Sequence, residues 1–259
     1  MRLAANARRV INCAAFFIFG LVAIAPLRAA DIYVAAVEHP GRSADDLKRD
    51  GIDHPAEILR LSGIKPGMQV ADVLAGDGYY SELLSYLVGP KGHVQLLNNT
   101  GFDKFSNNAW QQRIADHHLA NVEHRTVAMD HLGLADASLD AVVLIKVYHD
   151  LYWVDEKLGW PKIDVGAVLD QLERALKPGG ILLVVDHAAK AGTGSADAGT
   201  LHRIDEDYAR KDFEAHGFEF VKSSDLLRKP EDKRDQISYK PPMLGKTDRF
   251  VYVLRKRGK

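Results

Sequence analysis

Cysteine is almost absent from this chain of 259 residues, in which Cys13 is the only one. Because Cys13 lies in an N-terminal stretch that we expect to be removed, the remaining chain can form no disulfide and use no thiolate nucleophile. An excess of positive charge is missing too: the formal net charge is -1, which predicts no global basic surface for nucleic acid. The composition, 46% hydrophobic and 27% charged, is that of an ordinary globular protein.

No acidic residue precedes Asp31. Arginines open the chain, an apolar run follows over residues 10–27, and Ala29 and Ala30 come directly after it. This layout predicts a secretory signal peptide over residues 1–30 and a periplasmic or secreted protein. An uncleaved inner-membrane anchor is the alternative, because the apolar run is nearly long enough to span a membrane. Cleavage would remove four arginines and leave a net charge of about -5.

After a polar lead-in at residues 31–50, apolar strands alternate with amphipathic helices. We expect strands at 69–74, 93–97, 122–127, 141–147, 181–185, 219–223 and 250–254, and helices at 55–62, 80–88, 105–118, 165–176 and 204–214. Such alternation predicts a mostly parallel sheet with right-handed crossovers, in which the last two strands pair as an antiparallel hairpin at the edge. Ligands of such sheets bind beyond the carboxyl ends of the strands.

A glycine turn follows the first strand, in the run DVLAGDGYYSEL. Gly76 and Gly78 let the backbone approach a ligand closely as it enters the next helix. A dinucleotide pyrophosphate would be repelled by Asp77, and Ser81 stands where a third glycine is wanted. S-adenosylmethionine (SAM) carries an ammonium and a sulfonium, so an acidic turn suits it. A tight turn without a ligand is the structural alternative.

Two longer runs, GIKPGMQVADVLAGDGYYSELLSYLVGPKGHV and ALKPGGILLVVDH, resemble the first-strand and fifth-strand motifs of class I SAM-dependent methyltransferases. The resemblance covers roughly residues 50–256. It implies a Rossmann-like three-layer α/β/α sandwich, with the domain at residues 51–259. More narrowly, HPAEILRLSGIKPG, VYHDLYW and KTDRFVYVLRK resemble a group of bacterial methyltransferases that are often exported.

The resemblance also implies a set of cofactor-binding residues. Asp72, Gly76, Asp77 and Gly78 would line the methionine half of SAM, Asn98 or its neighbour would hold the ribose, Asp130 would contact the adenine amine, and Lys146 and Tyr148 would lie beside the methyl group. Two positions depart from the family pattern. Leu74 replaces a glycine, and Asn98 replaces an acid whose charge would strengthen the bond to the ribose hydroxyls.

Tyr148, His149 and Asp150 form the best candidate reaction centre, because they follow a buried strand. With an ordinary pKa near neutrality, His149 is suited to accept a proton from the acceptor, and Asp150 to orient it. A merely structural His149 is the alternative, and His187 with this pair would make a two-histidine metal site, although we assign no metal. Aromatic residues after the same strand (Tyr152, Trp153 and Trp160) suggest a wall for a ring-containing acceptor or a packed lid.

The sequence therefore predicts a SAM-dependent methyltransferase that acts on a small-molecule or lipid-like acceptor. Nucleic acid is not the expected acceptor, because the fourth strand lacks the Asn/Asp-Pro-Pro-Tyr/Phe signature of the amino-methylating enzymes. Membrane contact is expected only through an uncleaved N-terminal segment. Two alternatives stay open: an exported, non-catalytic ligand-binding module on the same fold, and a dinucleotide-dependent oxidoreductase.

Overall fold

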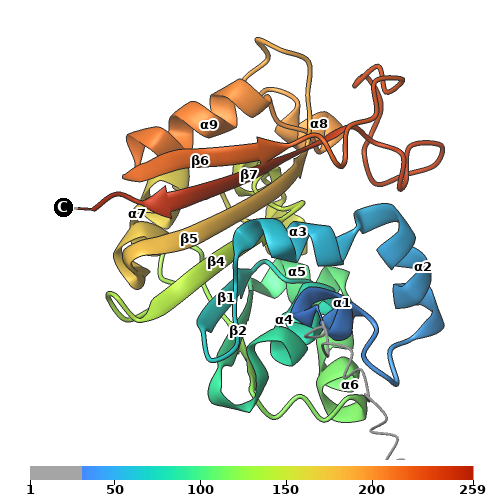
Figure 1. Ribbon diagram of the computed structural model, residues 1–259. Helices are drawn as coiled ribbons and strands as arrows, with labels where there is room; N and C mark the ends of the chain where they lie inside the picture. Colours follow the sequence, from blue (N-terminus) through green and yellow to red (C-terminus); the bar gives the residue numbers. More distant parts are fainter. Residues whose placement is uncertain (1–30, 259) are drawn as a thin grey trace, which may run out of the picture. The chain divides into compact units, whose positions relative to one another are not determined.

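A single sheet of seven strands runs through residues 31–258, the part of the chain that the computed structural model describes. The strands are β1 (Gln69–Val73), β2 (His93–Asn98), β3 (Val122–Thr126), β4 (Leu139–Ile145), β5 (Leu176–His187), β6 (Phe218–Ser224) and β7 (Arg249–Lys256). Their order is β3-β2-β1-β4-β5-β7-β6, with β7 antiparallel to both of its neighbours (Figure 1). The mostly parallel sheet with an antiparallel C-terminal pair is confirmed; within that pair, β6 takes the edge.

Helices cover both faces of the sheet and bury two apolar cores. One core packs β-strand side chains such as Leu144 against α7 (Val165–Ala175) and α9 (Glu206–Ala215). The other packs residues such as Val143 against α3 (Pro55–Ser62) and α4 (Tyr79–Val88). Neighbouring residues of one strand face opposite cores, which is why the central strands are apolar throughout.

The stretch expected to be a loose lead-in contains two helices, α1 (Ile32–Val37) and α2 (Ala44–Asp53). Asp31 and Ser43 cap their first turns through side-chain oxygens. The buried residues of α2 are Asp46 and Asp53, not apolar side chains. Because ion pairs hold α2 in place, it shows none of the apolar periodicity by which a packed helix is recognised.

The polar helix expected over residues 105–118 is divided into α5 (Thr100–Phe105) and α6 (Ala109–Asp116). Asn107 and Asn108 separate them with φ values of 51° and 52°, in the left-handed region that asparagine tolerates better than most residues. The break turns the chain so that Phe102 and Trp110 belong to separate helices.

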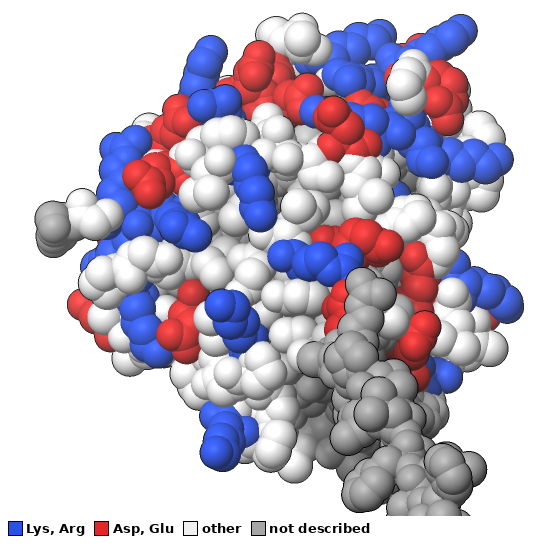
Figure 2. Space-filling model, viewed as in Figure 1, with Lys and Arg blue, Asp and Glu red and all other residues white. Residues whose placement is uncertain are grey.

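Basic and acidic side chains are interspersed on the face drawn in Figure 2. Among residues 31–258, the helices are too short or too polar to cross a membrane. The predicted signal peptide, which contains Cys13, lies outside the described residues and remains a prediction.

Candidate active site

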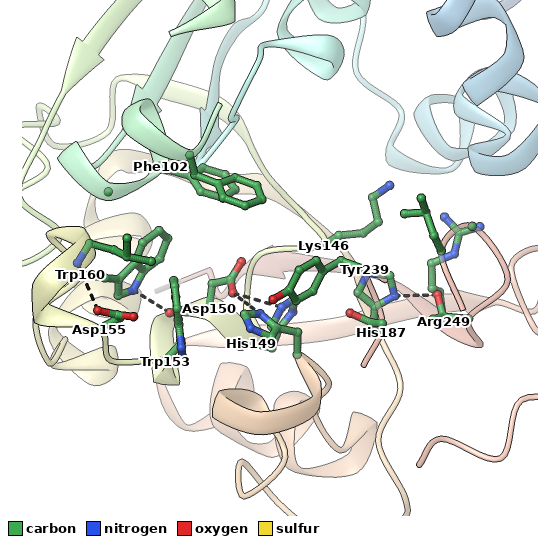
Figure 3. Close-up of a pocket in the computed structure, with 18 of the residues that line it drawn as sticks. Phe102, Lys146, His149, Asp150, Trp153, Asp155, Trp160, His187, Tyr239 and Arg249 are labelled. Carbon is green, nitrogen blue, oxygen red and sulfur yellow. Dashed lines mark hydrogen bonds and ion pairs between the residues drawn. The ribbon is translucent and has the colours of Figure 1, made fainter. Parts of the chain in front are cut away.

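A cavity of about 560 Å³ lies beyond the carboxyl ends of β4 and β5 (Figure 3). Its aromatic lining comes from Phe102, Phe105, Trp153, Trp160 and Tyr239, and its polar lining from Asp53, Lys146, His149, Asp150, His187, His202 and Arg249. The volume falls within the range of small-molecule sites, and an apolar wall with a few converging polar groups is typical of them. The position agrees with the rule that parallel sheets bind ligands at this edge.

His149 lies at the centre of the polar groups. It opens the short 3-10 turn η2 (His149–Tyr152), and its Nδ1 is 2.7 Å from Oδ1 of Asp186, the penultimate residue of β5. Its Nε2 is 3.2 Å from Oδ1 of Asp150. Burial alone would lower the pKa of His149, but the carboxylates of Asp150 and Asp186 outweigh it and raise the pKa to about 10. The imidazole is therefore charged at neutral pH in the free protein, unlike the neutral base that its ordinary pKa suggested.

His202 completes this polar cluster from a distant part of the sequence. It ends α8 (Ala198–Leu201) with φ 51° and ψ 56°, and its Nδ1 lies 3.1 Å from Oδ1 of Asp150. The rings of Trp153 and Tyr239 lie 5.3 Å and 4.7 Å from the His202 ring, centre to centre. These neighbours fix its orientation toward Asp150. His202 could not be recognised from the sequence, because a lone histidine in a Gly-rich stretch carries no motif.

The opposite end of the cavity is formed around a buried carboxylate, Asp53. Lys146 Nζ lies 2.8 Å from Asp53 Oδ2, Arg49 Nε lies 2.9 Å from the same oxygen, and Arg249 also donates to this carboxyl. Burial opposes ionisation of Asp53, but the three cations, Lys146 first, hold its pKa well below the ordinary value. Burial lowers the pKa of Lys146 to about 8. Helix α2 thus supplies a buried acid that pairs with three cations, of which Lys146 and Arg249 line the cavity.

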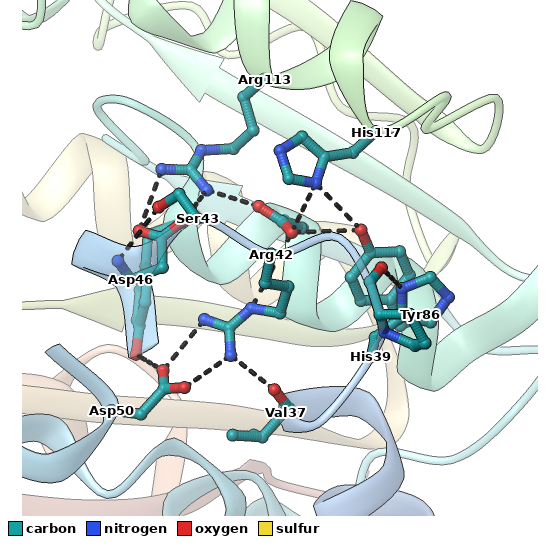
Figure 4. A network of polar contacts seen from close by, with 12 residues as sticks. Val37, His39, Arg42, Ser43, Asp46, Asp50, Tyr86, Arg113 and His117 are labelled. Carbon is teal, nitrogen blue, oxygen red and sulfur yellow. Dashed lines mark hydrogen bonds and ion pairs between the residues drawn. The ribbon is translucent and has the colours of Figure 1, made fainter. Parts of the chain in front are cut away.

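A network of buried ion pairs fastens α2 and its preceding loop to the domain (Figure 4). Arg42 makes a two-fold contact with Asp50, at 2.6 Å and 2.9 Å, and Asp50 also accepts from the Tyr79 hydroxyl at 2.6 Å. Arg113 of α6 donates to Asp46 at 2.6 Å and to the buried Glu82. Two-fold arginine–carboxylate contacts are specific in geometry, so they orient α2 relative to α4 and α6.

The glycine turn lies beside the cavity but does not line it. Gly76 and Gly78 have φ values of 62° and 82°, and Leu74, at the family's first glycine, also takes a left-handed φ of 54°. Leu74 and Tyr79 are both buried. Phe102 separates the turn from the cavity: its ring lies 3.4 Å from the place that a Cβ at Gly76 would occupy, and it also lines the cavity.

Asn98, at the end of β2, uses its side chain to hold the glycine turn and does not line the cavity. Its Oδ1 accepts from Gly76 N at 2.9 Å, and its Nδ2 donates to Gly76 O at 3.0 Å and to Asp103 Oδ1 at 2.9 Å. The neighbouring Asn99 caps α5 through Oδ1, and its buried Nδ2 has no hydrogen-bond partner among the described residues. Of the two candidate asparagines at this strand end, Asn99 is therefore the one whose amide Nδ2 is free to donate to a ligand.

Three of the predicted site residues line the cavity: Lys146, His149 and Asp150. Tyr148 does not line the cavity. It is buried in the core that contains α7 and α9, where its hydroxyl donates to Asp212 and lies 3.1 Å from the hydroxyl of Tyr152. The predicted cofactor residues Asp72, Gly76, Asp77, Gly78, Asn98 and Asp130 are outside the lining, and Asp130 is exposed. Asp72 is buried and accepts from Ser81 Oγ at 2.7 Å. Of the three aromatic residues expected to form a wall or a packed lid, Trp153 and Trp160 line the cavity with ring centres 5.2 Å apart, and Tyr152 does not line it.

The chain belongs to the methyltransferase domain family, whose pattern it matches over residues 64–226, so the family that the sequence motifs predicted is confirmed. Among curated proteins it is 29% identical over 175 residues to the ubiquinone/menaquinone biosynthesis C-methyltransferase UbiE of Shewanella oneidensis, covering 65% of this chain and 64% of that protein. The Shewanella baltica protein of the same name is 31% identical over 130 residues, 49% of this chain and 46% of that one. The chain thus aligns with less than two thirds of these relatives' length.

Solved structures support the fold. A SAM-dependent methyltransferase from Aquifex aeolicus superposes with a TM-score of 0.57 at 21% identity, over 83% of this chain and 100% of that one. The [4+2]-cyclase SpnF superposes with a TM-score of 0.59 at 16% identity, over 86% of each chain. At these identities the likeness concerns the fold alone.

The residues near the glycine turn fit SAM in their chemistry. Gly76 offers bare backbone, and apart from its two sequence neighbours the nearest group to it is the flat ring of Phe102. The unpartnered Asn99 Nδ2 is a donor for a ribose oxygen, and leaving such a buried donor unbonded is costly. Asp77, in the same turn, is 40% exposed at its side chain, and its carboxylate is paired with Arg113 at 3.1 Å.

Proposed function

We propose that this methyltransferase transfers the methyl group of SAM to a ring-containing, apolar acceptor of small-molecule or lipid-like character, bound in the cavity of Figure 3. The observation that carries this proposal is the combination of aromatic walls with a polar floor at the strand ends. Trp153 and Trp160 form one wall and Phe102 another, and Phe102 and Trp160 meet edge to face with ring centres 5.5 Å apart. Such surfaces bind flat rings well.

The mouth of the cavity favours an acceptor with an apolar extension. Four lining residues expose much of their apolar surface: Phe105 (70%), Leu244 (61%), Leu158 (51%) and Tyr239 (40%). Large apolar side chains gathered on a surface mark sites where apolar ligands or membranes dock. A ring with an alkyl or isoprenoid tail would place its ring inside and its tail along this rim. The quinone-pathway name of the relatives from Shewanella agrees with such an acceptor.

SAM supplies an activated methyl group when it is bound, so this chain's task is mainly to position the acceptor and exclude water. In our proposal Gly76, Asp77 and Asn99 bind the cofactor on one side of the Phe102 ring. On the other side, Lys146, His149 and Asp150 orient the polar atoms of the acceptor. Phe102, which contacts both regions, would then be the partition at which the two ligands meet.

Methyl transfer from isotope-labelled SAM tests the proposal. The purified protein is incubated with alkylated hydroquinols and with water-soluble catechols of equal ring substitution, and methylated products are identified by mass spectrometry. We expect transfer to the alkylated acceptors. The Trp153→Ala variant should raise the KM for the acceptor at least tenfold and leave the SAM-induced rise in Tm unchanged, because Trp153 lines only the acceptor cavity. Phe220→Ala, on the edge strand, is the matched control.

Failure of SAM and of its demethylated product to raise the Tm would contradict the cofactor assignment and favour a non-catalytic binding module. A rise in Tm without transfer to either class of acceptor would contradict the proposed acceptor alone.

We also propose export through residues 1–30, on the sequence pattern described above. Fractionation of expressing cells tests it: a processed chain in the periplasm or medium is expected, and a full-length chain in the cytosol would contradict it.

A further inference from the structure

We propose that His149, Asp150 and His202 form a binding site for a first-row divalent transition metal ion in the floor of the cavity. One potential ligand atom from each of these three residues lies within 4.8 Å of the other two. Two histidines and one carboxylate are a ligand set that suits zinc, iron, cobalt or nickel, and three protein ligands leave further positions open for a substrate.

The spacing of the ligand atoms agrees with a coordination sphere. A tetrahedral zinc ion with bonds of about 2.0–2.1 Å holds its ligand atoms about 3.3 Å apart. Asp150 Oδ1 lies 3.2 Å from His149 Nε2 and 3.1 Å from His202 Nδ1. Two of the three edges are therefore already at the required length, and the third, between the two histidine nitrogens, is at most 4.8 Å.

Asp186 orients His149 as the outer partner of a metal-bound histidine does. Its Oδ1 is 2.7 Å from His149 Nδ1, and its Oδ2 accepts from the His149 backbone N at 2.8 Å. With its Nδ1 hydrogen donated to Asp186, His149 can bind a metal ion through Nε2, and the ion displaces the proton that Nε2 directs at Asp150 in the free protein. Carboxylate–histidine–metal arrangements of this kind fix the ring and its tautomer.

His202 is held toward the cluster at a conformational cost. Its φ of 51° lies in the left-handed region, where residues other than glycine are strained. Trp153 and Tyr239 confine its ring. Such strain is maintained only where the surrounding structure fixes it, and functional sites are where it concentrates.

His187, the third ligand considered from the sequence, is not part of the group of ligand atoms that lie within 4.8 Å of one another. Its Nδ1 lies 2.7 Å from Thr247 Oγ1. In the structure His202 takes the place that the sequence suggested for His187. The three ligands His149, Asp150 and His202 all line the aromatic cavity. An oxygen atom of the acceptor can take a vacant position on the ion, which places the acceptor ring between the walls described above. The metal site itself does not depend on the proposed methyl transfer.

Cobalt(II) binding tests the inference, because Co²⁺ reports nitrogen and oxygen ligation through visible d–d absorption. The full-length protein without a histidine tag is stripped with a chelator and titrated with Co²⁺, then with Zn²⁺ in competition. We expect one Co²⁺ per chain, displaced by Zn²⁺. His202→Ala and Asp150→Asn should abolish the absorption, and His93→Ala, at the opposite end of the parallel strands, should retain it.

A graded variant separates a metal site from a hydrogen-bonded cluster. Asp186→Asn removes the outer partner but no ligand, so Zn²⁺ affinity should fall about 10–100-fold without being lost. Equal Tm values for the stripped wild-type and variant proteins show that folding is retained. Absence of d–d absorption in the wild type, or its retention in both His202→Ala and Asp150→Asn, would overturn the inference.

Discussion

Asp72 gives the sharpest prediction for stability. Its side chain is buried in β1 and accepts one hydrogen bond, from Ser81 Oγ at 2.7 Å. Burial, and then the charge of Asp77, raise the pKa of Asp72 from 3.8 to about 7. Asp72→Asn keeps the shape and the acceptor for Ser81, and it removes the charge that burial disfavours.

Proton binding by Asp72 sets the direction in which the free energy of unfolding changes with pH. Because the folded-state pKa is raised, the stability that the proton gives Asp72 is fully present below pH 3.8 and is lost as the pH rises through about 7. The shift of about 3 pKa units corresponds to about 4 kcal/mol, since each unit is worth about 1.4 kcal/mol. We therefore expect Asp72→Asn to match the wild type near pH 4 and to exceed its free energy of unfolding by up to about 4 kcal/mol at pH 8.

Urea unfolding of both proteins at pH 4, 6 and 8 measures this difference. Asp45→Asn, an exposed acid on α2, is the control and should show no such trend. A difference that does not grow with pH, or an Asp72→Asn variant less stable than the wild type at pH 8, would refute the reasoning. Because the charged form of Asp72 favours the cationic cofactor, the same variant should bind SAM more weakly.

Two further substitutions test the backbone and the buried charges. Leu74→Gly should be about 1–2 kcal/mol more stable than Leu74→Ala by urea unfolding, the reverse of the usual order, because Leu74 has a left-handed φ of 54°; equal stability would show that the turn is unstrained. Arg249→Met removes one of the cations around the buried Asp53 and should cost about 3–5 kcal/mol in the same assay. A cost below about 1 kcal/mol would mean that Lys146 and Arg49 balance Asp53 alone.

The sheet could be predicted because its strands are apolar runs between strong turns. β4 and β5 are buried on both faces, and this alone produces the continuous Val, Leu and Ile pattern. The boundaries differ by a few residues, most of all in β5, which begins at Leu176 before the Lys-Pro-Gly-Gly turn. The parallel direction of β1 to β5 followed from the alternation with helices, whereas the order of the strands in the sheet was not predicted.

Helix α2 could not be predicted from an apolar pattern, because paired charges hold it in place. Arg42 is almost fully buried, yet a sequence pattern treats arginine as a surface residue. Its partner Asp50 lies eight residues away, and the partners of Asp46 and Asp53 lie 67 and 196 residues away in Arg113 and Arg249. Pairing over such separations leaves no local periodicity.

The candidate site could be predicted in part. Lys146, His149 and Asp150 follow a buried strand, and the rule for parallel sheets was enough to locate them. His202 depends on where a four-residue helix ends and on a left-handed residue after it, neither of which the local sequence specifies. The roles of Asn98 and Asn99 differ because only one of two adjacent amides faces the glycine turn.

The position of β7 between β5 and β6 affects the order in which the sheet can fold. This strand bonds to β5 on one side and β6 on the other, although β5 ends at His187 and β7 begins at Arg249. Until β7 has been synthesised, β5 keeps an open edge and β6 has no strand to pair with. The nascent domain therefore waits for a segment far along the chain before its sheet can close, and contacts between distant segments of this kind slow folding.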